Sequence, residues 1–277
     1  MFDTLSRSWG LVKASAGVLR SDTALMLFPA LSGLATLGVL ATFALPLFAL
    51  RVFDHGVGLA ALVVAFVFYF CQYGVIVFFN AALVGAATIR LDGGRPSLSD
   101  GLAIAMRRLP AVLGYAAIAA TVGVLLQTMK RGDNSLLARL LGGGLGVAWT
   151  LAAFLVVPVL VNRDVGPIDA LKDSVSLLKR TWGENAIGSV GIGAAFGLLT
   201  ALGAVIGVAL TWMALMHATT VGIVVGVACA IGLMLLAVYQ AALTGIYSAA
   251  LYRYAVTHDV PAGFSGAQLA HAFEPQR

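Results

Sequence analysis

The chain has 277 residues, of which 60% are hydrophobic and only 10% are charged, and its formal net charge is +5. Soluble domains carry about 25% charged residues, so this composition excludes an ordinary soluble protein and is typical of a multi-span membrane protein. The Lys and Arg residues lie in short segments between apolar runs, where they orient membrane helices. Nucleic-acid binding is therefore not expected.

Six apolar runs are long enough to cross a membrane, which takes about 20 residues of α-helix. They cover residues 24–50, 59–89, 109–129, 140–161, 187–213 and 221–250. Pro158 falls inside the fourth run and should bend it, because proline cannot donate a helical hydrogen bond. The sequence therefore predicts an all-α, polytopic protein with six transmembrane helices.

The basic residues are divided unequally between the two sides of these spans. Thirteen of the 17 Lys and Arg residues lie on the side that holds both termini, and four lie on the other. Because cytoplasmic loops carry an excess of Lys and Arg, both termini are expected in the cytoplasm.

A short motif recurs after the second, fourth and sixth runs. It reads RLDGGRP at residues 90–96, RDVGP at 163–167 and HDVP at 258–261. The recurrence predicts one transmembrane domain over residues 1–277, built from three pseudo-repeats at about 1–95, 96–166 and 167–260, with a short cytoplasmic tail at 261–277. Each repeat would be an amphipathic helix followed by a transmembrane hairpin.

Amphipathic patterns mark the helix expected to begin each repeat. The clearest apolar stripe, at steps of three and four, is Ile168, Leu171, Val175, Leu178 and Trp182; weaker stripes are Phe2, Leu5, Trp9, Val12 and Ala16, and Leu98, Leu102, Met106 and Leu109. Such helices are expected to lie in the membrane interface. Basic residues on or beside them should contact lipid head groups: Arg107, Arg108, Lys172, Lys179 and Arg180.

Three longer segments carry a resemblance to a known family. They are LFPALSG in the first run, FFNAALVGAATIRLDGG at the end of the second, and GPIDALKDSVSLLKRTWG after the fourth. Together they resemble a bacterial integral-membrane family of unknown function, and distantly the membrane domain that accompanies glycerophosphodiester phosphodiesterases. The resemblance implies a fold and a place in the bacterial inner membrane, and it implies no catalytic residues.

Residue types that carry chemistry are sparse. The four histidines, His55, His217, His258 and His271, form no His/Glu pair at helical spacing, so neither a metal site nor a cofactor is expected. All acidic residues lie outside the spans or at their ends, whereas proton relays and ion-coupled pumps usually need ionisable groups at depth. The sequence therefore does not predict an enzyme or an ion-coupled carrier.

Two segments share a pattern, FFNAALVG at residues 78–85 and VYQAALTG at 238–245. Their amides, Asn80 and Gln240, fall near the middle of the membrane, roughly 15 and 20 Å along the helix from Arg90 and Arg253. Other polar side chains extend each amide into a stripe. The candidate polar pocket or path comprises Gln72, Tyr73, Asn80, Gln240, Thr244 and Tyr247.

Two interpretations of the amides stay open. They either hydrogen-bond across a helix interface, a contact worth about 0.6 kcal/mol on average in membranes, or line a path or pocket for a neutral solute or a lipid. Glycine pairs spaced by four, Gly203 with Gly207 and Gly222 with Gly226, predict close packing of the last two spans.

The leading functional hypothesis is a non-enzymatic transport, channel or lipid-handling module for a neutral solute or lipid. The alternative is a structural or regulatory scaffold whose basic helices bind anionic lipid or a protein partner. Membrane lipids are the expected partners, and a homo-oligomer stays open. A polar cavity at the depth of the two amides would favour the first hypothesis, and its absence the second.

Overall fold

The computed structural model describes residues 13–49, 59–131, 145–146, 148–182, 186–257 and 264, and these residues are helical apart from short connecting turns. Residues 13–21 form the first described helix. Then follow η1 (Thr23–Met26), α2 (Leu27–Ala49), α3 (Leu59–Leu91), α4 (Leu98–Arg107), α5 (Leu109–Arg131), α7 (Val156–Asn162), α8 (Pro167–Trp182), α9 (Ala186–His217) and α10 (Thr219–Thr257). The all-α prediction is confirmed. The first expected amphipathic stripe lies, apart from Ala16, outside the described residues.

Five helices are long and apolar enough to cross a membrane, and a bent pair raises the number to six. The five are Thr23–Ala44, Leu62–Leu91, Leu109–Leu126, Phe196–His217 and Thr219–Thr257. The pair is Ala148–Asn162 with Pro167–Lys179, and the second helix is bent by 119° from the first. The fourth expected span, residues 140–161, is described only in part; a turn at residues 154–155 interrupts it, and the 119° bend follows it, between Asn162 and Pro167.

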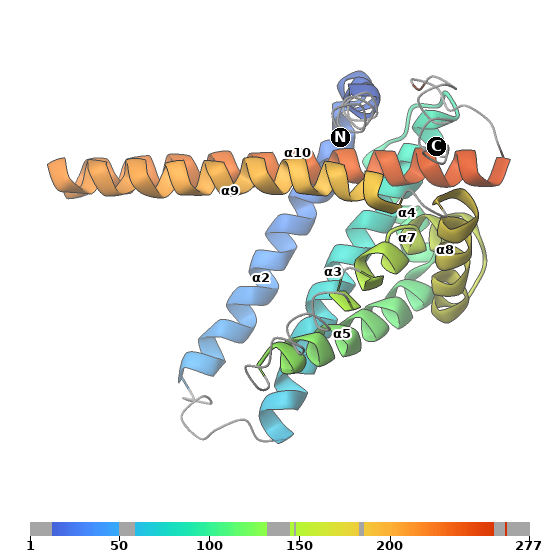
Figure 1. The fold of residues 1–277 in the computed structure, drawn as a ribbon, viewed down its shortest axis with the longest axis horizontal. Coiled ribbons are helices and arrows are strands. Elements are labelled where there is room, and N and C mark those ends of the chain that lie inside the picture. The colour runs from blue at the N-terminus through green and yellow to red at the C-terminus, as the bar shows by residue number, and fades with distance from the viewer. Residues whose placement is uncertain are drawn as a thin grey trace.

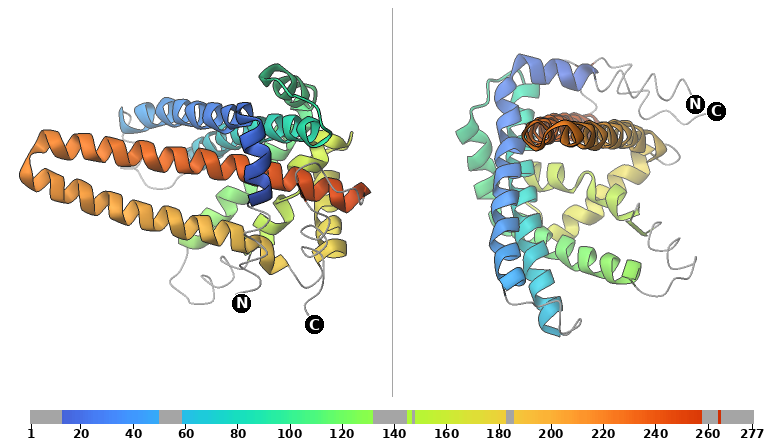
Figure 2. Two further views of the ribbon diagram at one scale, coloured as in Figure 1. Left: turned by 90° about the horizontal axis from the view of Figure 1, so that it is seen from above. Right: turned by 90° about the vertical axis from the view of Figure 1, so that its left-hand side faces the viewer.

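Helices α9 and α10 form a long antiparallel hairpin that reaches beyond the other helices (Figures 1 and 2). Ala218 alone separates them. A methyl group built on Gly207 would lie 3.2 Å from the Cβ of Cys229, and one on Gly226 would lie 3.1 Å from the Cγ2 of Thr211. The glycines therefore let the two backbones approach closely, as their spacing predicted.

The stretch AALVGAA of α3, residues 81–87, is a tightly packed part of the bundle, and all seven residues are buried. A methyl group on Gly85 would lie 2.8 Å from Ile104 of α4. One on Gly101 of α4 would lie 2.7 Å from the carbonyl oxygen of Ala82. Helix α4 can thus pack on α3 only because both helices present glycine or alanine where they meet.

Helix α4 begins with a capping box, in which the Ser97 Oγ accepts from the Asp100 amide and the Asp100 carboxylate accepts from the Ser97 amide. These hydrogen bonds lower the pKa of the Asp100 carboxyl. The helix buries Gly101 and Ala105, whereas Met106, placed in the expected apolar stripe, is 56% exposed. Helix α4 thus approaches its neighbours through its smallest residues, and the placement of Met106 in the membrane interface stays a prediction.

Helix α8 packs on α7 and α5 through Ala170, Ser174 and Leu178, all three buried. Leu171 packs partly buried against this core. Ile168, expected in the same apolar stripe, is 59% exposed, and its placement in the membrane interface stays a prediction. Ser174 faces α7 and the residues that precede it.

Candidate functional site

A cavity of about 600 Å³ lies between α3, α5, α10 and the short helical segment before α7, residues 148–153. Helix α2 contributes Pro29 and Ser32 to its edge. Polar side chains converge on it from four directions: Ser32, Tyr73, Asn80, Thr150, Gln240 and Thr244. Among the described residues that line it, none is acidic, basic or histidine.

Four of the six residues expected to form a polar pocket line this one cavity: Tyr73, Asn80, Gln240 and Thr244. The other two do not. Tyr247 is buried and packs its ring against Phe154 at a centroid distance of 6.0 Å. The Oε1 of Gln72 is buried and makes no hydrogen bond to the residues that the structure describes.

The two similar segments bring the amides together by crossing each other. A methyl group built on Gly245 of α10 would lie 2.3 Å from the Cδ2 of Leu83 and 3.6 Å from the Oδ1 of Asn80. Because any side chain at position 245 would collide with α3, glycine is what lets α10 pass beside Asn80. The shared AAL and Gly pattern is therefore a packing motif that frames the cavity.

Hydroxyl and amide groups in the cavity wall differ in how they are bonded. The hydroxyls of Thr150 and Thr244 donate at 2.9 Å to carbonyls of their own helices, those of Gly146 and Gln240. The side-chain amides of Asn80 and Gln240 make no hydrogen bond to any described residue. Within the described part of the chain, the two amides thus have donors and acceptors that remain for the contents of the cavity.

One wall of the cavity is the broken helix, which turns at Phe154 and Leu155. The bend was predicted from Pro158, which has no N–H to offer the residue four positions earlier. The buried Ser174 of α8 completes the break: its Oγ donates to the carbonyl of Ala152 at 2.7 Å and accepts from the amide of Leu155 at 3.2 Å. We call this pair of bonds the Ser174 bridge.

Sequence reasoning did not single out Ser174, nor the aromatic side chains of Tyr115 and Trp149. These rings also line the cavity and stack on each other at a centroid distance of 6.4 Å. Both have an apolar body and a polar tip within apolar runs, a combination that suits a partly polar cavity and could have marked them.

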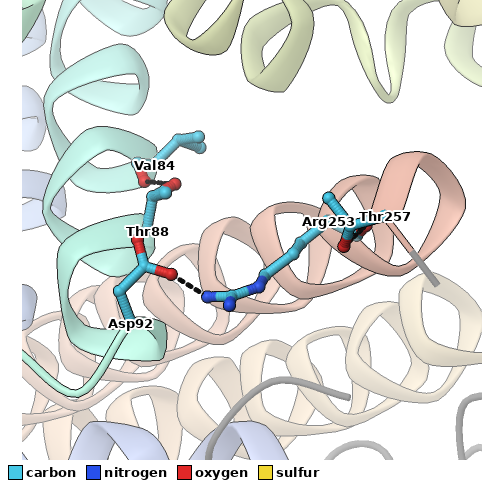
Figure 3. A network of polar contacts seen from close by, with 5 residues as sticks. All are labelled: Val84, Thr88, Asp92, Arg253 and Thr257. Carbon is cyan, nitrogen blue, oxygen red and sulfur yellow. Dashed lines mark hydrogen bonds and ion pairs between the residues drawn. The ribbon is translucent and has the colours of Figure 1, made fainter. Parts of the chain in front are cut away.

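Ion pairs join the ends of several helices on one side of the bundle. Arg253 of α10 pairs with Asp92 just beyond α3, as Figure 3 shows. Arg108 pairs with Asp164 after α7, and Arg163 with Asp173 of α8 at 2.8 Å. The acidic residues of the first two recurring motifs, Asp92 and Asp164, therefore tie separate helices together.

The basic residues expected at lipid head groups lie at different places. Arg107 and Arg108 line a second cavity of about 410 Å³ between α3, α4 and α7. Lys172 is exposed and pairs with Asp169 at 3.3 Å, and Lys179 is exposed. The side chain of Arg180 lies outside the described residues.

Residues 59–264, well over half of the chain, match the model of a family of unknown function, DUF6159. No curated protein matches the chain. The matched region contains the second cavity, the Ser174 bridge, the hairpin and all lining residues of the first cavity except Pro29 and Ser32. The chain is a multi-pass membrane protein by the length and hydropathy of its helices, and it belongs to the DUF6159 family of unknown function.

Proposed function

We propose that this protein is a non-enzymatic membrane module that binds a neutral solute, or the uncharged polar part of a lipid, in the cavity between α3 and α10 and passes it through or along the membrane. One observation carries the proposal. Asn80 and Gln240, 160 positions apart in the chain, line the same cavity, and neither amide is hydrogen-bonded to a described residue.

The energetics favour a bound polar partner over a purely structural role for the amides. An amide transferred to hydrocarbon without a hydrogen bond costs about 4–8 kcal/mol on an alkane scale. If Asn80 and Gln240 served only to join helices, they would bond across an interface, and no such bond joins them to a described residue. Water or a polar ligand in the cavity would recover the missing hydrogen bonds.

Size and lining support a small amphiphilic ligand. Pockets for small molecules usually measure about 300–1,000 Å³ and combine apolar walls with a few polar groups, and this cavity of about 600 Å³ falls in that range. Phe79, Phe154 and Val157 supply apolar wall, and the two amides can both donate and accept hydrogen bonds. The lack of charge among the described lining residues favours a neutral ligand over an ion.

The resemblance of the chain to the membrane domain that accompanies glycerophosphodiester phosphodiesterases is consistent with a ligand derived from lipid, and it remains an expectation. Under the alternative hypothesis, in which the protein is a scaffold that binds anionic lipid or a protein partner, the cavity would have no transported ligand. The inner membrane and cytoplasmic termini likewise stay proposals, supported by the distribution of Lys and Arg.

The test is flux through vesicles that contain the purified full chain. Two probes separate the classes of ligand: glycerol, followed by light scattering, and a fluorescent phosphatidylethanolamine, followed by quenching at the outer leaflet. We expect the protein to accelerate at least one of them over protein-free vesicles. Asn80→Leu combined with Gln240→Leu should return that rate to the protein-free value, because the cavity loses both amides.

A matched control replaces two threonines, Thr42→Val and Thr121→Val, whose hydroxyls donate to their own helices and whose side chains lie outside the cavity. This variant should keep the wild-type rate. If neither probe moves faster with the wild-type protein, the transport proposal fails and the scaffold hypothesis takes its place. If the double leucine variant keeps full flux, the cavity is not the path.

A further inference from the structure

A second cavity, of about 410 Å³, lies between the end of α3, α4 and α7 and shares no lining residue with the first. Arg107 and Arg108 line it together with the polar side chains of Thr88 and Asn162. Ile89, Ile104 and Val161 form its apolar part. Two guanidinium groups therefore stand beside an apolar wall at the ends of membrane-spanning helices.

The turn between α4 and α5 places both arginines at this cavity. Arg107 is the last residue of α4, and Arg108 leaves helical geometry with φ −98° and ψ 8° before α5 begins. On a continuous helix, adjacent side chains point about 100° apart and do not share one face. The break at Arg108 lets two consecutive cations line the same space.

The two arginines differ in how their charge is compensated. Arg108 pairs with Asp164, whose side chain is 96% exposed. The Nε of Arg107 donates to the carbonyl of Ala103 at 3.3 Å, and within the described part of the chain Arg107 has no acidic partner. With two arginines and one aspartate, the cavity keeps a net positive charge.

The polar groups beside the arginines are already engaged as donors. The Thr88 hydroxyl donates to the carbonyl of Val84 at 2.9 Å, visible in Figure 3, and the Asn162 Nδ2 donates to the carbonyl of Pro158 at 2.8 Å. The guanidinium groups of the two arginines thus supply the donors that remain for a ligand, most of all that of Arg107. Its planar fork suits two oxygens of one phosphate, and it stays charged at every physiological pH.

We propose that this second cavity binds an anionic phosphate group through Arg107 and Arg108, with the rest of the ligand along Ile89, Ile104 and Val161. The apolar wall favours the head group of an anionic phospholipid as the source of the phosphate, because its acyl chains continue into the membrane. A free phosphate would make the same contacts with the arginines, but it has no apolar part to pack against the wall. This site is separate from the cavity of the proposed function and does not depend on it.

Binding can be measured on the purified full chain by native mass spectrometry and by titration in neutral detergent. The probes are dioleoyl phosphatidylglycerol, dioleoyl phosphatidylcholine with the same chains and no net charge, and inorganic phosphate. Arg107→Gln should weaken binding of phosphatidylglycerol about tenfold, the effect of losing one charge-assisted hydrogen bond. Arg95→Gln, an exposed residue outside both cavities, is the matched control and should leave binding unchanged.

A second variant is expected to act in the opposite direction. Asp164→Asn removes the carboxylate that competes for Arg108, so phosphatidylglycerol should bind more tightly. Free phosphate is identified as the ligand if inorganic phosphate binds, if Arg107→Gln weakens that binding, and if phosphatidylglycerol binds no more tightly than inorganic phosphate. Equal binding of the two lipids, equal losses in the Arg107 and Arg95 variants, or no binding of any probe would overturn the proposal.

Discussion

Ser174→Ala removes both hydrogen bonds of the Ser174 bridge. The side chain is fully buried, and its Oγ joins the carbonyl of Ala152 to the amide of Leu155 where the helix is broken. Each buried backbone group left without a partner costs about 1–3 kcal/mol, so the variant should lose about 2–6 kcal/mol of unfolding free energy. The lower end applies if the backbone relaxes and repairs part of the helix.

The assay combines a global and a local measurement on protein in detergent micelles. Denaturant titration gives the loss of stability, and hydrogen–deuterium exchange reports on residues 152–157. We expect the amide of Leu155 to exchange faster in the variant, because its acceptor is gone. Ser176→Ala on the same helix is the control, since Ser176 is exposed.

The reasoning is refuted if the Ser174 and Ser176 variants have the same stability and the same exchange over residues 152–157. A loss of stability without faster exchange at Leu155 would also count against the bridge, because it would place the damage elsewhere in α8. The two hydrogen-bond distances of the Ser174 bridge predict faster exchange that is confined to residues 152–157.

Two further predictions concern the contacts between helices. Gly207→Cys should form a disulfide with Cys229 on mild oxidation, because a Cβ at 207 would lie 3.2 Å from that of Cys229 and disulfides join Cβ atoms about 3.5–4.5 Å apart. A Cβ at position 197 would have no atom of another part of the structure within 4 Å, so the cysteine of Gly197→Cys should stay reduced. Peptide mass spectrometry that finds a disulfide in Gly197→Cys and none in Gly207→Cys would contradict the hairpin. Asp92→Arg should cost about 1 kcal/mol or less in unfolding free energy, because its pair is partly exposed, and adding Arg253→Asp should restore the loss. A double variant that unfolds more easily than Asp92→Arg alone would show that these side chains do not pair.

The spans could be predicted because hydropathy is a local property of the chain. Residues 59–89 were expected and α3 is Leu59–Leu91; residues 109–129 were expected and α5 is Leu109–Arg131. The length of the apolar run largely determines where such a helix begins and ends, because backbone groups in a membrane must be hydrogen-bonded within the helix. The three pseudo-repeats remain a prediction.

The buried faces of the surface helices could not be predicted in the same way. Periodicity marks where apolar residues fall, and it does not show that α4 and α8 contact their neighbours through small residues such as Gly101 and Ser174. Contact is decided by how closely two backbones can approach, which depends on the partner helix. A single stretch of sequence does not contain that partner.

The candidate site was predictable in its polar residues and less so in its extent. Gln72 and Tyr247 stand next to the cavity-lining residues Tyr73 and Ser248, and adjacent positions on a helix do not share a face, which is why they lie outside the cavity while Asn80 and Gln240 line it. Trp149 enters the lining from the broken helix, whose path depends on the distant residue Ser174.

The single residue between α9 and α10 bears on how the protein is made. With Ala218 as the whole connection, α9 and α10 meet in a single tight turn, and no loop extends beyond it. The two helices should therefore enter the membrane as one unit, already joined along their glycines. The insertion machinery would then have to accommodate α9 and α10 together, rather than one after the other.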